Sequence, residues 1–225
     1  MPTTRFQPFV NVFVPFALIV TALNLDAGFG LLGGLAPPAQ SNPSPNPTLA
    51  RVVYTIWVTF LFAAPGLVLF GLYDLRTAPP IVFRYWQLFW GFGFLAYFLH
   101  SYYAMDVWFD WDFAQIIRRQ TLLVTVMNFL LLGVWGVDVL IGVFGGQGSG
   151  GVLIQRFRWF THILFAVMVY TAGIYFHSTF RSNTGLILAW VLVGTFGLSL
   201  VVRLIWGDTS RRCDDSPVPA TAGTR

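Results

Sequence analysis

Six long apolar segments constrain the fold of this chain more than any other feature of its sequence. A helix that crosses a membrane needs about 20 mostly apolar residues, because the hydrocarbon core is about 30 Å thick. Six stretches come close to this length, at residues 9–25, 52–73, 82–104, 121–144, 157–177 and 185–205. The sequence therefore predicts an all-α integral membrane protein, built as a bundle of about six transmembrane helices.

The charge content supports this class. Charged residues make up 10% of the chain and hydrophobic residues 56%, whereas soluble domains carry about 25% charged residues. The net charge of +4 is spread over the segment ends, which indicates membrane topology and argues against nucleic-acid binding. We expect the partners to be the lipid bilayer and other membrane subunits, in a bacterial or archaeal cytoplasmic membrane.

The kinds of charged residue exclude several cofactors. All basic residues are arginine and all acidic residues are aspartate. A retinal Schiff base is excluded because it requires a lysine. Di-iron sites built on glutamates are excluded because the chain has no glutamate. The one cysteine, Cys213, allows no internal disulfide and no iron–sulfur cluster held by this chain alone.

The connections divide the chain into a bundle and a tail. Residues 1–206 form the predicted bundle, and residues 207–225 are expected to be a disordered polar tail. Residues 37–47 hold five prolines and predict an extended external loop. The first segment can also be read as a signal segment. Read as running on past Asp26 into residues 27–36, its length and this internal Asp26 favour a membrane anchor.

Arginine placement predicts the orientation. With the N-terminus inside, nine arginines fall on the inner side and four on the outer side. Positive charges favour the cytoplasmic side, so both termini are expected in the cytoplasm. Arg118 and Arg119 are the main exceptions, because they lie on the predicted outer side.

Two histidines are predicted to lie at one depth near the outer face. His100 is near the end of the third segment, and His177 ends the fifth. Gly93 and Gly173 share helix faces with them, and Arg181 stands nearby for an anionic group. Axial imidazoles, small residues and a cation are what a haem b between two helices requires. The cofactor-binding hypothesis is therefore a haem b held by these residues.

The same histidines also suggest a metal site. Imidazole and carboxylate groups suit copper or zinc, so His100, His177 and Asp106 form the alternative ligand set. Asp106 belongs to an aromatic and acidic stretch, residues 101–120, which predicts a short helix in the membrane interface. This stretch is interpreted either as an aromatic belt or as a lid over an outer site.

A second polar pair is predicted toward the inner side. Asp138 is in the fourth segment and His162 in the fifth, and a glycine-rich hairpin at residues 145–151 joins the two segments. Consecutive elements with a short connection are usually neighbours, so the sequence predicts an Asp138–His162 hydrogen bond. The pair is interpreted either as a tie between helices or as a proton relay.

These observations favour a subunit or accessory of a membrane complex, redox-linked through a haem b or a metal near the outer face. The alternative is a stand-alone transporter or lipid-handling protein, whose histidines tie helices or couple protons. No recognisable enzyme motif surrounds the histidines. Enzymatic activity therefore stays open at this point.

Overall fold

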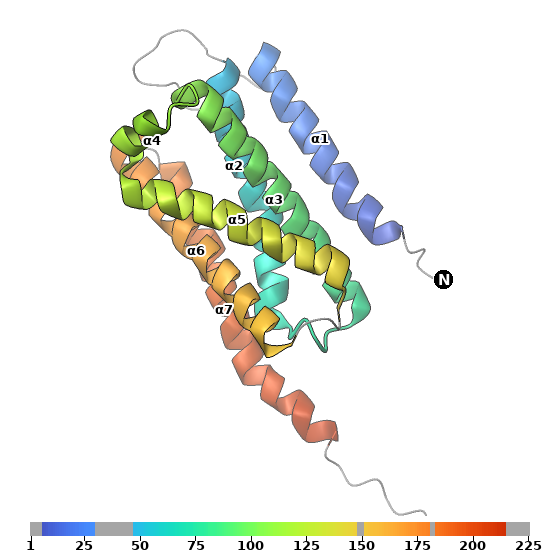
Figure 1. Cartoon of the computed structure of the whole chain (residues 1–225). Coiled ribbons are helices and arrows are strands. Elements are labelled where there is room, and N and C mark those ends of the chain that lie inside the picture. Colours follow the sequence, from blue (N-terminus) through green and yellow to red (C-terminus); the bar gives the residue numbers. More distant parts are fainter. Residues whose placement is uncertain (1–5, 30–46, 148–150, 181–182, 215–225) are drawn as a thin grey trace, which may run out of the picture.

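The computed structural model describes residues 6–29, 47–147, 151–180 and 183–214, and every regular element in these ranges is an α-helix (Figure 1). The helices are α1 (Gln7–Phe29), α2 (Pro47–Leu72), α3 (Pro80–Trp108), α4 (Phe113–Gln120), α5 (Leu122–Gly145), α6 (Val152–Phe180) and α7 (Asn183–Asp214). The all-helical prediction is confirmed for the described residues.

Five of these helices contain segments long and apolar enough to cross a membrane. The segments are Gln7–Ala27, Ala50–Leu72, Leu122–Gly145, Val152–Ala172 and Leu186–Trp206. The chain is therefore a multi-pass helical membrane protein. The predicted third span is the exception: α3 has 29 residues, but it is rich in Trp, Tyr and polar side chains and is not among the five.

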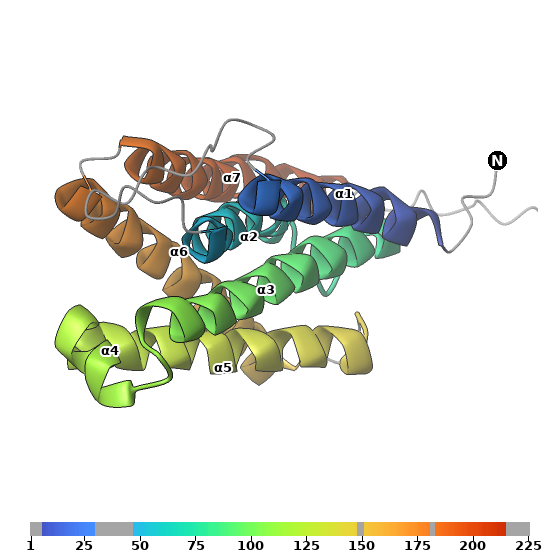
Figure 2. The same ribbon diagram turned by 90° about the horizontal axis from the view of Figure 1, so that it is seen from above.

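The helices are arranged around an antiparallel pair formed by α2 and α3. Helix α1 packs on both members of this pair, and α7 packs on α2 and α6. Helix α5 lies on the side of α3 that is opposite to α1, and it also contacts α6 (Figures 1 and 2). We call the end that holds residues 73–79 the turn end, and the opposite end, which holds α4, the α4 end (Figure 1).

Two glycines of the bundle allow helices to approach closely. A Cβ atom on Gly93 of α3 would lie 3.0 Å from the backbone nitrogen of Ala63 in α2. A Cβ atom on Gly71 of α2 would lie 1.9 Å from Ser199 Oγ in α7. Small residues of this kind are a common basis of helix association in membranes. These glycines allow direct contact of α2 with α3 and with α7.

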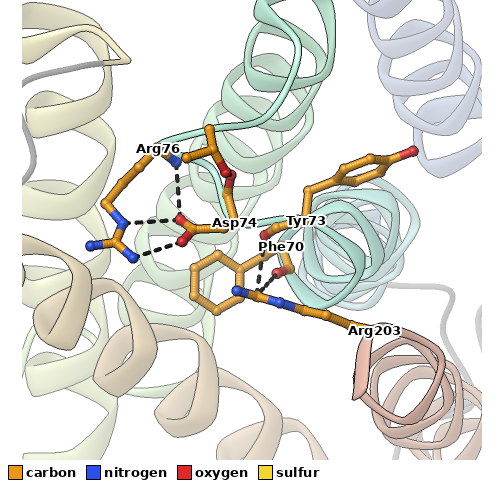
Figure 3. A network of polar contacts seen from close by, with 6 residues as sticks. Phe70, Tyr73, Asp74, Arg76 and Arg203 are labelled. Atoms are coloured by element: carbon orange, nitrogen blue, oxygen red, sulfur yellow. Dashed lines mark hydrogen bonds and ion pairs between the residues drawn. The ribbon is translucent and has the colours of Figure 1, made fainter. Parts of the chain in front are cut away.

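Hydrogen bonds and an ion pair connect polar groups at the turn end (Figure 3). Arg203 of α7 donates from Nη1 to the backbone oxygens of Phe70 (3.5 Å) and Tyr73 (3.2 Å), which satisfies carbonyl groups at the end of α2. In the following turn, Arg76 Nη2 lies 2.7 Å from Asp74 Oδ2. The hydrogen bond from the Arg76 side chain holds the pKa of Asp74 below its usual value.

The sequence predicts a short helix within residues 101–120, and the structure forms α4 there. Asp112 caps it by accepting a hydrogen bond from the Ala114 backbone nitrogen at 2.8 Å. Ile116 is its buried residue, and Arg118 forms an exposed ion pair with Asp112 at 3.3 Å. This gives α4 one apolar face and one charged face, as a helix at a membrane surface requires.

The chain ends differ in part from the sequence prediction. Helix α7 continues to Asp214, so the polar segment predicted as a tail from residue 207 begins as helix. Starting a helix is costly, but extending an existing one adds one backbone hydrogen bond for each residue, which allows α7 to continue into a polar segment. Residues 215–225 and most of the proline-rich loop at 37–47 lie outside the described residues.

Candidate functional site

A buried cluster of charged and aromatic side chains lies where α3, α5 and α6 meet. Asp138 of α5 and Arg158 of α6 have exposed fractions of 0% and 1%. Arg158 Nε lies 3.4 Å from Asp138 Oδ1, and Trp90 Nε1 of α3 donates to Asp138 Oδ2 at 2.9 Å. An isolated carboxylate would be very costly at this depth. The guanidinium and the indole make its burial tolerable.

The hydrogen bonds of His162 determine which of its nitrogens carries the proton. Trp86 Nε1 lies 3.2 Å from His162 Nε2, and an indole N–H can only donate. His162 Nδ1 lies 2.7 Å from the backbone oxygen of Arg158, which can only accept. His162 is therefore the neutral tautomer with its proton on Nδ1.

Aromatic rings cover both faces of the His162 imidazole. The Phe70 ring is stacked on it with the centroids 3.8 Å apart, and the Trp90 ring with the centroids 4.0 Å apart. The side chain is fully buried. Since both nitrogens and both faces are occupied, His162 has no free position with which to bind a haem or a metal ion.

Arg158 is held between its ion pair and two aromatic rings. Its Cζ atom lies 5.0 Å from the Trp86 ring centroid and 5.8 Å from that of Phe83. Contact of this kind between a cation and a ring face is favourable, more so away from water. Among the described residues, Arg158 Nη2 has no hydrogen-bond partner, so the charge is stabilised mainly by Asp138 and the rings.

The structure brings Asp138 and His162 together but does not place a hydrogen bond between them. His162 Nδ1 lies 3.9 Å from Asp138 Oδ2, and each side chain makes its hydrogen bonds elsewhere. The sequence prediction missed Arg158, which it treats only as an inner positive charge. Its position four residues before His162 places both on one helix face, and this spacing could have revealed it.

His100 is arranged differently from His162. It lies toward the α4 end of α3, half-buried, with Nδ1 2.8 Å from the backbone oxygen of Val52 in α2. A carbonyl can only accept, so Nδ1 carries the proton and Nε2 carries a lone pair. Histidines that bind metals commonly have this second hydrogen bond, which fixes the ring orientation. Tyr97 is stacked near the ring, with the centroids 6.2 Å apart.

The other residues of the haem and metal hypotheses are placed only in part. His177 and Gly173 belong to α6, but their side chains lie outside the described set, and so does Arg181. Asp106 is exposed on α3. Gly93 faces α2, so the space beside it is filled by Ala63 and not by a cofactor edge.

Within the described ranges, no three His, Cys, Asp or Glu side chains gather as a metal-binding group. Asp26 of α1 is a further buried acid, with an exposed fraction of 3%, and it accepts a hydrogen bond from the Tyr54 hydroxyl of α2. This contact ties α1 to α2 at the α4 end.

Comparison with family models, with curated proteins and with solved structures gives no match for this chain.

Proposed function

We propose that this protein is an integral subunit or accessory of a membrane complex, in which His100 supplies an imidazole ligand to a haem b near the α4 end. The observation that carries the proposal is the contact between His100 Nδ1 and the Val52 backbone oxygen. It fixes the ring and leaves Nε2 as the ligating atom. Of the two histidines with described side chains, His162 has both nitrogens engaged, so His100 is the one suited to this role.

Haem fits this histidine better than a bare metal ion does. A haem takes four ligands from its own macrocycle and needs one or two axial residues from protein. A zinc ion needs three or four protein ligands, and the described residues bring no such group together. His177 is the proposed second axial ligand, with Gly173 and Arg181 four residues before and after it in the sequence as the other proposed haem contacts. In the copper or zinc version of the site, His177 and Asp106 join His100.

The subunit role and the topology belong to the same proposal. A haem with two axial ligands needs a second group besides His100, and we propose that it comes from His177 or from another chain. We propose that α3 is the sixth span, since it packs along α2 over its length. Six spans place both termini on one side. The turn end is then cytoplasmic, because Arg76, Arg84, Arg156 and Arg203 belong to it.

Spectroscopy of the purified protein tests the proposal. We expect a reduced-minus-oxidised haem b spectrum that is lost in His100→Ala and in His177→Ala. A matched Asp106→Asn variant separates the two versions of the site, because it leaves a haem spectrum unchanged but lowers the content of a bare metal. A colourless protein without copper or zinc by elemental analysis would contradict the proposal. Co-purification in mild detergent tests for partner subunits.

The lipid-handling alternative is favoured by one observation. A groove of about 300 Å³ lies between α3 and α5 and is lined by Gln87, Leu88, Gly91, Phe92, Leu95, Val139 and Val143. Its walls are almost entirely apolar and suit an acyl chain. Mass spectrometry of retained lipid would show a specific lipid in the wild type and its loss in Gly91→Leu, which fills the groove. Haem binding through His100 predicts no effect of that variant.

A further inference from the structure

A line of aromatic rings connects the Asp138 cluster to His100 through the core of the bundle. Successive ring centroids are 4.0 Å apart for His162–Trp90, 4.5 Å for Trp90–Trp135, 5.6 Å for Trp135–Tyr97 and 6.2 Å for Tyr97–His100. We call Trp90, Trp135 and Tyr97 the aromatic relay. It joins the two histidines whose side chains the structure describes, through rings in near contact.

The relay is built from two helices and is sealed from solvent. Trp90 and Tyr97 are seven residues apart on α3, about 10 Å along its axis, and Trp135 of α5 contacts both. The exposed fractions of Trp90, Trp135 and Tyr97 are 0%, 0% and 7%. Phe165 of α6 packs edge-on against both indoles and adds to this apolar wall.

The residue types of the relay distinguish it from ordinary core packing. Phenylalanine is the commonest aromatic residue in this chain, with 23 copies against 9 Trp and 8 Tyr. A phenyl ring is very hard to oxidise, whereas indole and phenol rings can lose one electron to a strong oxidant. Electron tunnelling decays steeply with distance, so rings in near contact transfer an electron in short and rapid steps. Each position of the relay holds a ring that can take part.

The two indoles of the relay differ in where their protons can go. Trp90 Nε1 donates to Asp138 Oδ2 at 2.9 Å. Trp135 Nε1 has no hydrogen-bond partner among the described residues. Oxidation makes an indole N–H far more acidic. The Trp90 proton then has an acceptor in Asp138, and the Trp135 proton has none among the described residues. Trp135 is therefore suited to be oxidised only transiently. Trp90 is suited to be the residue that stays oxidised.

We propose that the aromatic relay passes one electron from Trp90 to a one-electron oxidant at the α4 end, and that Asp138 takes up the Trp90 proton. Trp90 loses one electron and its Nε1–H proton and becomes a neutral radical. Asp138 Oδ2 gains that proton, and the oxidant gains the electron by way of Trp135 and Tyr97. The oxidant would be the metal centre held through His100, in an oxidised state strong enough to take an electron from an indole, and in this respect the inference rests on the proposed function.

An attached photo-oxidant tests the relay without any cofactor at His100. Asp106 is exposed on α3 and lies nine residues beyond Tyr97, about 14 Å along the helix. Asp106→Cys, with Cys213→Ser to leave a single thiol, accepts a ruthenium tris-bipyridyl label. Trp108→Phe and Trp111→Phe remove the two indoles that are nearest to residue 106 in the sequence. A laser flash with a soluble quencher then produces Ru(III), so absence of haem would refute the proposed function and leave this test intact.

We expect a neutral tryptophan radical in transient absorption and in electron paramagnetic resonance. The signal is lost in Trp90→Phe, and its formation is blocked in Trp135→Phe and in Tyr97→Phe, which keeps the ring in place. Trp190→Phe, the same change at an exposed site on α7, leaves it unchanged. The charge-neutral double variant Asp138→Asn/Arg158→Gln gives the radical cation instead. A neutral tryptophan radical that persists in Trp90→Phe or forms in Trp135→Phe, or no tryptophan radical at all in the labelled protein, would overturn the proposal.

Discussion

The Trp90 indole donates a hydrogen bond to Asp138 Oδ2 at 2.9 Å, and both side chains have an exposed fraction of 0%. This bond joins α3 to α5, and the ion pair with Arg158 joins the same carboxylate to α6. Three helices are thus held at one point by a single side chain. Because the group is charged and buried, its removal affects more than the bonds that it makes.

Asp138→Asn is expected to lower the free energy of unfolding by about 3–5 kcal/mol, because it leaves the Arg158 charge buried without its counter-ion. Thermal unfolding in detergent, followed by circular dichroism, measures this loss. The control is Asp138→Leu/Arg158→Met, which removes both charges. This double variant should be more stable than Asp138→Asn. Equal or greater destabilisation in the double variant would show that the unpaired Arg158 charge is not the main cause of the loss.

Gly71→Ala is expected to lower the unfolding free energy by about 1–3 kcal/mol, because it overpacks the contact between α2 and α7. The added Cβ would lie 1.9 Å from Ser199 Oγ. Introducing Ser199→Gly in the same chain should restore most of the loss. Gly194→Ala is the matched control on α7, since no atom lies within 4 Å of its added Cβ. Equal losses of unfolding free energy in Gly71→Ala and Gly194→Ala would contradict the explanation by overpacking.

Arg203→Ala is expected to destabilise the turn end by about 1 kcal/mol, the usual net contribution of such hydrogen bonds. The variant leaves the carbonyls of Phe70 and Tyr73 without the Arg203 guanidinium. Hydrogen exchange of backbone amides should therefore increase at the end of α2 and not at its beginning. Arg203→Lys should restore part of the protection, because a lysine amine also donates to helix C-terminal carbonyls.

Asp74 predicts a pH dependence at the turn end. Its pKa is lowered in the folded protein, chiefly by the hydrogen bond from Arg76. A lowered pKa means that the stabilising contribution is complete well above the unfolded value of about 4 and is lost as the pH falls through the folded value. Asp74→Asn should therefore lower stability at neutral pH and make little difference at about pH 2. A constant difference across this range would contradict the assignment.

The sequence was sufficient for the helical membrane class and for the vicinity of Asp138 and His162, since both follow from apolar length and short connections. The sequence could not predict which side chains Asp138 and His162 contact, because these contacts depend on how each helix is rotated about its axis. Trp86, Trp90, Tyr97 and His100 lie at spacings of four, seven and three, so they share one face of α3. This aromatic face of α3 could be predicted from the sequence. Its contact with Trp135 of α5 could not, because it depends on how the two helices pack.

The third span shows a similar limit. The sequence predicts a membrane span at residues 82–104 because the aromatic residues there count as apolar. The structure forms a helix in this region, but its Trp and Tyr side chains pack against other helices and include hydrogen-bonding groups. Such residues are apolar in the ring and polar at one atom. Apolar length alone therefore does not decide whether α3 crosses the membrane.

Titration of the purified protein with haem tests the central claim most directly, with Cu²⁺ and Zn²⁺ titrated in parallel. The account predicts saturable binding of one haem per chain that is lost in His100→Ala and retained in Tyr102→Ala, an exposed neighbour on α3. Equal haem binding by wild type and His100→Ala, or no saturable binding of haem or of either ion, would contradict the role assigned to His100.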